Sequence, residues 1–334
     1  MRTRSGVSSI RIVTISDERI EMRAAKTRGS TAVLVAVIAA MLAIIVSAGS
    51  ASAVTLKGLW APFNRCPVED PALLSANINQ GTIAVCLAVD SPNGSMKIGN
   101  LSLKTGASET QMGVFGDEGA FSAIAPRGST IVAAPVEIPG GLAALVCPKG
   151  ADFKGDVCES AASRPPRLNA VKSTLESAGP PSNLSLFAAF EIGAPIVTLP
   201  AKLHLQNPLL GPNCYIGSKA HPILLQPATI IAPTPVFFRF DVDGTLDEEA
   251  GLIFEALFTN TSQGDSTFAI GTATGCGWNG RLNAAINRTV GLPSPAGNNS
   301  TVLNEVTSGL VGVNEPTETD GQDFSAYWHA AIVK

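Results

Sequence analysis

The stretch FFRFDVDGTLDEEAG, residues 237–251, contains the residue types that phosphoryl transfer needs. In that chemistry one aspartate attacks phosphorus, a second serves as acid and base, and a glycine lets the loop turn closely around the phosphate. Asp241, Asp243 and Gly244 occupy these places. The apolar residues before Asp241 predict a strand that delivers both carboxylates to a loop.

About ten residues of this stretch resemble motif I of the haloacid dehalogenase-like hydrolases. That resemblance implies a downstream Lys that holds the phosphorylated aspartate and a later acidic pair that holds magnesium. No Lys occurs between Lys219 and Lys334, and no suitable acidic pair follows Glu248-Glu249. An Arg is a poor substitute, because its guanidinium is a rigid planar fork and not a compact ammonium. We therefore predict that Asp241 is not a nucleophile.

Two other interpretations of these residues remain. The first is a strand from Val236 to Val242 followed by an Asp243-Gly244 turn, which is a strong hairpin signal. The second is a calcium loop formed by Asp241, Asp243 and Asp247, because hard cations take several carboxylate oxygens. The segment lacks the Gly at the sixth position and the Glu at the twelfth that an EF-hand uses. The hairpin is favoured, and calcium is the alternative.

Serine hydrolase chemistry would need a nucleophile, a histidine and an acid in one place. The chain has no G-x-S-x-G motif, and Ser294 has a proline on each side. His204 is expected on the polar face of one strand, and His329 beside Ser325 and Tyr327 on a face of the last strand. Because histidines on exposed strand faces are usually solvated, we assign no catalytic residue and no cofactor.

All six cysteines lie beyond residue 53, and an even number in an exported chain predicts disulfides. Many pairings are possible, but sequential pairing is favoured because each pair then lies in its own local segment. The favoured pairs are Cys66–Cys86, Cys147–Cys158 and Cys214–Cys276. A zinc site is disfavoured, because the chain has no C-x-x-C and its three histidines, His204, His221 and His329, are far apart.

The first 53 residues predict a secretory signal peptide. A basic leader precedes the unbroken apolar run TAVLVAVIAAMLAIIVSAG, and Ala51 and Ala53 supply the small side chains of a cleavage site before Val54. Three acidic residues upstream of Met22 do not suit such a leader, so Met22 is the expected start. An uncleaved anchor is the alternative, because the run is near the lower length limit for a spanning helix.

Cleavage would leave 281 residues with 16 basic and 24 acidic side chains, a net charge of −8. This balance, with no Lys/Arg cluster and few aromatic residues, argues against nucleic acid and anionic membrane surfaces as partners. We expect a secreted protein, extracellular or in the cell envelope, without integral membrane association. The sequence identifies no partner.

Most of the chain after residue 53 reads as short strands separated by Gly, Pro, Asn and Ser. In GTIAVCLAVD, residues 81–90, both alternating faces are apolar, which predicts a buried strand. In IVTLPAKLHLQ, residues 196–206, apolar and polar residues alternate, which predicts one wet face. Further strands are predicted in VFFRFDV, LIFEALF and FSAYWHAAIV, residues 236–242, 252–258 and 324–333.

Only two helices are expected, both late in the chain. One lies in NGRLNAAINRTVGLP, residues 279–293, with Asn279 as N-cap and Gly291 as the stop. The other lies in NNSTVLNEVTSGL, residues 298–310, where apolar residues recur at helical spacing. Many short strands with two short C-terminal helices predict a mainly β fold with a β-sandwich or barrel-like core.

Two proline pairs, Pro165-Pro166 and Pro180-Pro181, are the best candidates for a domain boundary. A boundary near residue 165 would separate a β-rich part, 54–165, from a β-rich part with the C-terminal helices, 166–334. The alternative is a single large domain, because the length suits either arrangement.

Three segments resemble a group of secreted proteins of actinobacteria that have no assigned function: LKGLWAPFNRCPV, KLHLQNPLLGPNCYIGS and GLPSPAGNNSTVLNEV. The resemblance implies export, an actinobacterial origin and paired cysteines near Cys66, Cys214 and Cys276. It implies no activity. We therefore expect an exported protein that is structural or binds an unidentified molecule, with a secreted hydrolase that has an unrecognised active site as the alternative.

Overall fold

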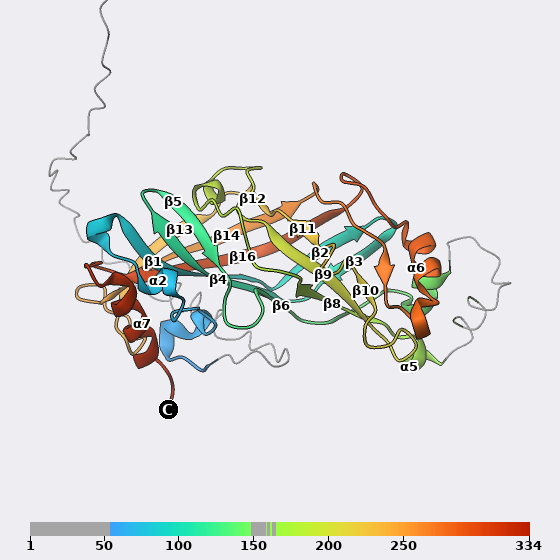
Figure 1. Ribbon diagram of the computed structural model, residues 1–334, viewed down its shortest axis with the longest axis horizontal. Coiled ribbons are helices and arrows are strands. Elements are labelled where there is room, and N and C mark those ends of the chain that lie inside the picture. Colours follow the sequence, from blue (N-terminus) through green and yellow to red (C-terminus); the bar gives the residue numbers. More distant parts are fainter. Residues whose placement is uncertain (1–53, 148–157, 159–160, 162–164) are drawn as a thin grey trace, which may run out of the picture. The chain divides into compact units, whose positions relative to one another are not determined.

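The computed structural model describes residues 54–147, 158, 161 and 165–334, which form two antiparallel sheets and several short helices (Figure 1). In this described part the first sheet has ten strands and the second has six. Their side chains meet in one hydrophobic core. The predicted mainly β, sandwich-like fold is confirmed. The predicted signal peptide lies outside the described residues.

The first sheet is organised around two long neighbouring strands, β14 and β16, paired from Ile253 opposite Val313 to Asp265 opposite Thr301. On the other edge of β16, β1 pairs with its C-terminal half and β2 with its N-terminal end. On the other edge of β14, β13 pairs with its N-terminal half and β12 with its C-terminal end. β3 pairs with β2, β4 pairs with β1, and β5 and β6 both pair with β4. The ten strands are β1 (Thr82–Ser91), β2 (Asn93–Ile98), β3 (Leu101–Thr105), β4 (Ser108–Asp117), β5 (Ala120–Ile124), β6 (Ile131–Ala133), β12 (Ala228–Ile231), β13 (Thr234–Phe240), β14 (Ile253–Asp265) and β16 (Ser300–Val313).

The second sheet is built around β9, whose residues alternate between buried and partly exposed positions. β8 pairs with one edge of β9, and β10 and β11 share the other edge. Lys202 and His204 lie on the wet face that the sequence predicted. The six strands are β7 (Val136–Glu137), β8 (Lys172–Ser177), β9 (Leu199–Gln206), β10 (Tyr215–Ile216), β11 (Ile223–Leu225) and β15 (Ala273–Thr274).

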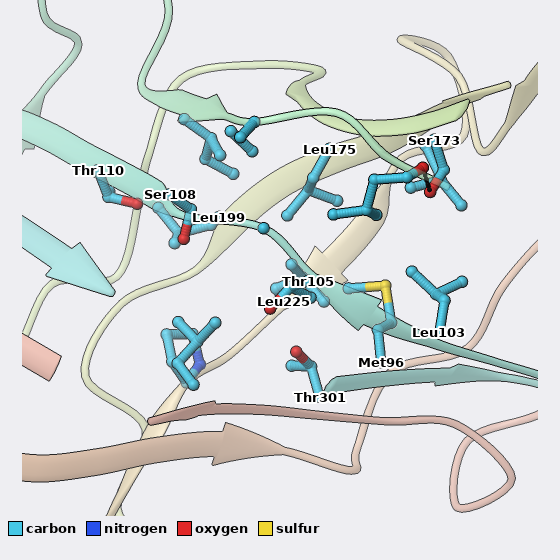
Figure 2. Close-up of a pocket in the computed structure, with 18 residues that line it drawn as sticks. Met96, Leu103, Thr105, Ser108, Thr110, Ser173, Leu175, Leu199, Leu225 and Thr301 are labelled. Atoms are coloured by element: carbon cyan, nitrogen blue, oxygen red, sulfur yellow. Dashed lines mark hydrogen bonds between the residues drawn. The ribbon is translucent and has the colours of Figure 1, made fainter. Parts of the chain in front are cut away.

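The main core lies between the two sheets. Leu175 and Leu199 of the second sheet lie opposite Met96 and Thr301 of the first (Figure 2). Both sheets use strands from either side of residue 165, since β1 pairs with β16 and β7 pairs with β8. The two parts that the sequence suggested are thus joined by backbone pairing in each sheet.

A second apolar layer covers part of the first sheet near β13, where Trp60 of η1 packs against Phe240 and Phe324 with ring centroids 5.4 and 5.9 Å away. The indole N–H of Trp328 donates to the carbonyl of Phe63 at 2.9 Å. The helices are η1 (Gly58–Phe63), α2 (Pro71–Leu74), η2 (Ile78–Gln80), α3 (Gly141–Val146), α5 (Pro166–Asn169), η3 (Phe187–Phe190), η4 (Trp278–Gly280), α6 (Asn283–Val290) and α7 (Asp320–Ala330). None of the helices in the described residues is long and apolar enough to cross a membrane.

The helix predicted within residues 298–310 is wrong, because this segment forms most of β16. Its apolar residues do recur at helical spacing, but the segment is rich in β-branched Thr and Val. Strands on both edges of β16 supply its backbone hydrogen bonds. Tertiary pairing therefore overrides the local pattern.

The last strand, predicted over residues 324–333, is also wrong, because Asp320–Ala330 is the helix α7. Phe324 and Trp328 are both fully buried. They are four residues apart, which places them on one face of a helix as well as on one face of a strand. Asp320 extends the same buried row by four residues. His329, Ser325 and Tyr327 therefore do not share one strand face.

The helix predicted within residues 279–293 is confirmed as α6, and Gly291 ends it in the left-handed conformation with φ 79°. Its start differs from the prediction. Asn279 lies in η4 with φ 54°, and α6 begins at Asn283. A glycine on each side of Trp278-Asn279 gives the chain a tight turn there, so the helix begins after it.

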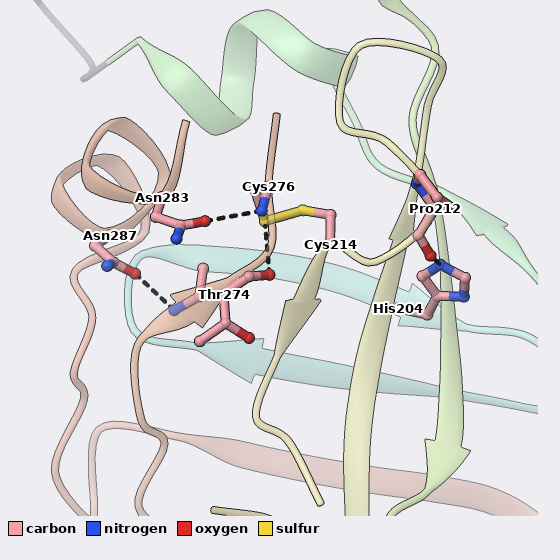
Figure 3. The surroundings of a disulfide bond; sticks show 8 residues. His204, Pro212, Cys214, Thr274, Cys276, Asn283 and Asn287 are labelled. Carbon is pink, nitrogen blue, oxygen red and sulfur yellow. Dashed lines mark hydrogen bonds between the residues drawn. A yellow bond between two sulfur atoms is a disulfide. The ribbon is translucent and has the colours of Figure 1, made fainter. Parts of the chain in front are cut away.

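Three disulfides are present, in the sequential pairs that the sequence favoured: Cys66–Cys86, Cys147–Cys158 and Cys214–Cys276. The last bond joins Cys214, just before β10, to Cys276, just after β15 and next to α6 (Figure 3). Two side chains of α6 reinforce this connection. Asn283 accepts from the Cys276 N–H at 2.8 Å, and Asn287 accepts from the Ala273 N–H at 2.7 Å.

Candidate functional site

The segment that suggested phosphoryl transfer forms a turn between β13 and β14. The Asp241 N–H donates to the Thr245 carbonyl at 2.9 Å, and the Asp243 carboxylate accepts from the Thr245 N–H at 2.9 Å. Hydrogen bonds from the side chain and backbone of Thr245 hold the pKa of the exposed Asp243 below its usual range. Asp247 accepts from the Ala250 N–H at 2.9 Å. The carboxylates of Asp243 and Asp247 thus stabilise local turns.

The same turn holds the N-terminal segment in place. Gly244 has φ 79° and Gly58 has φ 50°, and the two residues lie in contact. A Cβ on Gly244 would lie 2.3 Å from the Lys57 carbonyl oxygen, and a Cβ on Gly58 would lie 2.3 Å from the Gly244 oxygen. The Gly244 carbonyl also accepts from the Leu59 N–H at 3.1 Å. Glycine at this position serves the close approach of two backbones.

The calcium alternative gains no support from this geometry. Within the described residues, no group of three or more His, Cys, Asp or Glu side chains lies close enough to hold a metal ion. Asp241, Asp243 and Asp247 follow one another around the turn and do not converge.

His204 lies on the outer face of the second sheet, where both of its ring nitrogens have partners. Nδ1 lies 2.8 Å from Glu176, and Nε2 lies 3.1 Å from the Pro212 carbonyl, as Figure 3 shows for the second contact. The ring stacks on Tyr215 at 4.5 Å between centroids, and Lys202 lies 3.8 Å from the same Tyr ring. This arrangement leaves no ring nitrogen free to accept a proton from a nucleophile.

His329 lies on α7, half exposed, with Nε2 hydrogen-bonded to Glu69. Arg127 is close to the same carboxylate and lies over the Trp328 ring at 5.2 Å. In the described part of the chain, neither His204 nor His329 contacts a serine hydroxyl. The structure therefore pairs each histidine with an acid and assembles no triad around either one.

The most distinctive feature of the described residues is an apolar cavity of about 300 Å³ over the inner face of the first sheet. Its floor contains Ile83, Val85, Leu87 and Val89, one of the two apolar faces that the sequence identified in β1. Further lining residues come from β4, β14 and β16, among them Met112, Phe258 and Leu310. No ionisable side chain lines it.

A strap formed by residues 184–197, which includes η3, closes one side of this cavity. The strap leaves the second sheet and returns to it where Ser182 and Thr198 exchange two backbone hydrogen bonds. Phe187 packs against Phe121 of β5 at 5.8 Å, and Phe190 packs against Phe258 of β14 at 5.2 Å. The strap therefore reaches two strands that lie on opposite sides of β16 and β1.

Buried polar side chains face the otherwise apolar cavity. Gln263 and Ser308 line it and are 9% and 8% exposed. Neither side chain has a hydrogen-bond partner among the described residues, whereas the lining residue Thr261 donates to the Ile231 carbonyl. Because both side chains line the cavity, Gln263 and Ser308 can hydrogen-bond to an uncharged polar group inside it.

A second cavity of about 70 Å³ also lies between the sheets (Figure 2). It is lined by residues such as Met96, Leu103 and Leu225 and contains no ionisable side chain. The two cavities have four lining residues in common: Thr110, Leu199, Pro227 and Leu303. They are therefore neighbouring parts of one apolar space between the sheets.

The sequence analysis identified the floor of the cavity only as a buried strand and missed the strap. Phe187 and Phe190 lie three residues apart in LSLFAAFEIGAP, a segment with one charged residue, between prolines. An aromatic pair in a short, nearly uncharged loop was the available signal. Comparisons with protein-family models, curated proteins and solved structures found no match to this chain.

Proposed function

We propose that the chain is an exported binding protein, not an enzyme, and that it binds an apolar ligand in the cavity between the sheets. The observation that carries this proposal is the cavity itself. Protein interiors pack as densely as organic crystals and contain few voids larger than a water molecule. A space of about 300 Å³ lies at the lower end of the size of small-molecule sites.

The cost of such a cavity supports a ligand as its reason. Enclosed residual cavities destabilise proteins by about 24 cal/mol for each Å³, because their lining loses packing contacts, and a cavity open to solvent loses less. A ligand that fills the space recovers this packing energy.

The lining favours a ligand that is uncharged where it is buried. A charged group would lose its hydration without meeting an opposite charge, because no Asp, Glu, Lys, Arg or His lines either cavity. The amide of Gln263 and the hydroxyl of Ser308 suit one ester, amide or hydroxyl group. An acyl chain with a neutral polar group has this chemistry.

Titration with the neutral fluorophore N-phenyl-1-naphthylamine tests the proposal. The secreted protein is expected to bind it saturably, at one site for each chain. Val89→Phe places a ring in the cavity and should weaken binding by at least about tenfold, which corresponds to about 1.4 kcal/mol. Val333→Phe adds the same ring at an exposed position near the C-terminus and should leave the affinity unchanged.

Two results would overturn the proposal. One is the absence of saturable binding, or equal affinity in the protein and in Val89→Phe. The other is turnover of a nitrophenyl ester by the purified protein that His204→Gln or His329→Gln abolishes, which would instead support the hydrolase.

A further inference from the structure

The strap that closes the larger cavity carries exposed apolar side chains. We call these three residues the apolar rim: Phe187, Phe190 and Ile192. Their exposed fractions range from 50% for Phe190 to 71% for Ile192. Phe187 and Phe190 also line the cavity, so the rim and the cavity are continuous.

The rim is held in place by contacts behind it. The Thr229 hydroxyl donates to the Ala189 carbonyl at 2.7 Å, and the Gly193 N–H donates to the Thr229 carbonyl at 3.0 Å. These bonds connect the strap to β12, and Figure 1 shows the strap helix beside that strand. The aromatic contacts of Phe187 and Phe190 support the rim from the first sheet. The exposed side chains are thus carried on a backbone anchored on both sides.

The rim is almost without charge. Residues 186–197 contain one ionisable side chain, Glu191, and residues 226–237 contain none. Protein–protein interfaces are typically enriched in aromatic residues, Met and Arg and carry several direct hydrogen bonds. The rim has two Phe but no Tyr, Trp, Met or Arg, and the hydroxyl of Thr229 behind it is already used. Its chemistry complements a partner that offers hydrocarbon and requires no ion pair.

The position of the rim adds a second reason for a lipid partner. An apolar ligand that crossed water to reach the cavity would expose its chain at a cost of about 0.8 kcal/mol for each CH₂ group. A mouth that lies directly on a lipid layer removes that step. Burial of a Phe or Ile side chain contributes about 1.5–3 kcal/mol, so several rim residues together suffice for reversible attachment.

We propose that the apolar rim inserts into the surface of an uncharged lipid layer and places the mouth of the cavity against it. This inference rests on the proposed function, because a ligand in the cavity explains why the rim lies at its mouth. The rim holds no Lys or Arg, so attachment does not require anionic lipid and resists added salt. Only the apolar side chains enter the layer.

Flotation with vesicles of phosphatidylcholine tests this inference on the secreted chain, which carries every described element. The protein is expected to float with the vesicles at both low and high salt. Phe187→Ser with Ile192→Ser should reduce the bound fraction by at least about tenfold, because two largely exposed apolar side chains are lost. Trp278→Ser removes an even more exposed aromatic outside the rim, 77% exposed, and should float as the unmodified protein does.

The outcomes separate the two proposals. The rim inference is overturned if the protein does not float, if the rim double variant floats equally well, or if the rim instead makes a dimer that the double variant loses. Ile192→Ser alone keeps the contact between Phe187 and Phe121, so its thermal unfolding should match that of the protein while its bound fraction also falls. If the protein floats but does not bind naphthylamine, the rim inference stands and the ligand role of the cavity is refuted. If it binds naphthylamine but does not float, only the rim inference is refuted.

Discussion

Single residues explain why DVDGT matches a phosphatase motif in a chain that lacks the rest of the machinery. The carboxylate of Asp243 accepts from the backbone N–H of Thr245, and Gly244 allows the turn to touch Gly58. Residues suited to hold a phosphate closely are also suited to hold a second backbone closely. Glycine serves both because it has no Cβ and tolerates positive φ.

Gly244→Ala should destabilise the protein more than Gly119→Ala does. Both glycines have positive φ, 79° and 88°, so each alanine incurs the left-handed strain of about 1–2 kcal/mol. Gly119 has open space around it, whereas a Cβ on Gly244 would collide with the Lys57 backbone. Urea denaturation of the two variants measures the difference. Equal losses would show that the contact between Gly244 and Gly58 contributes nothing.

At the scale of elements, covalent and polar links compensate for strands that are short. β10 and β15 have two residues each, which is too few for stable pairing alone. The buried Cys214–Cys276 bond and the two asparagines of α6 hold these strands together (Figure 3). The positions of β10 and β15 at this end of the second sheet therefore depend on the disulfide and on the two asparagines.

Replacement of Cys214 and Cys276 by serine should cost more stability than replacement of Cys147 and Cys158. The first pair closes a loop with a sequence separation of 62 and the second a loop with a separation of 11. The chain-entropy relation gives about 4 and about 3 kcal/mol, as upper figures. Denaturant unfolding of the two double variants checks the order. A larger loss from the shorter loop would contradict the entropic reason.

At the scale of the whole molecule, buried acids determine how stability depends on pH. Burial raises the pKa of Glu255 to about 8, and burial together with the charge of Glu109 raises that of Asp90 to about 7. Burial also raises the pKa of Asp320 to about 6, although this carboxylate accepts from the Ala84 N–H at 2.8 Å. Folding therefore favours the protonated form of all three groups.

Stability should fall as the pH rises from about 4.5 to about 8. In that window the folded chain retains the proton of Glu255 while the unfolded chain loses it, so each unit of pH costs about 1.4 kcal/mol for this group. Glu255→Gln should flatten the profile above about pH 7, where Asp90 no longer contributes, and raise stability at pH 8. The exposed Glu248→Gln should follow the original profile. Denaturation midpoints measured across this pH range test the prediction. If the midpoints of Glu255→Gln depend on pH as those of the protein do, the buried-acid explanation is wrong.

The sequence by itself determined those features that arise from neighbouring residues. Alternation predicted β1, β9, β13 and the first half of β14, and Gly291 predicted the end of α6. Local proximity along the chain also favoured the correct partner for each cysteine. In each case the physical cause lies within a short window, as a side-chain period, a positive φ or a short loop.

Only the tertiary structure decided the features that depend on distant contacts. Residues 298–310 belong to a strand because β14 on one edge, and β1 and β2 on the other, pair with the backbone of β16. The segment around Phe324 and Trp328 is a helix, and both side chains are buried on its inner face. The cavity and the rim depend on where two sheets and a strap fail to fill the space between them. An apolar residue has the same pattern in the sequence whether it packs against a neighbour or faces an open cavity, so only the packed fold distinguishes the two.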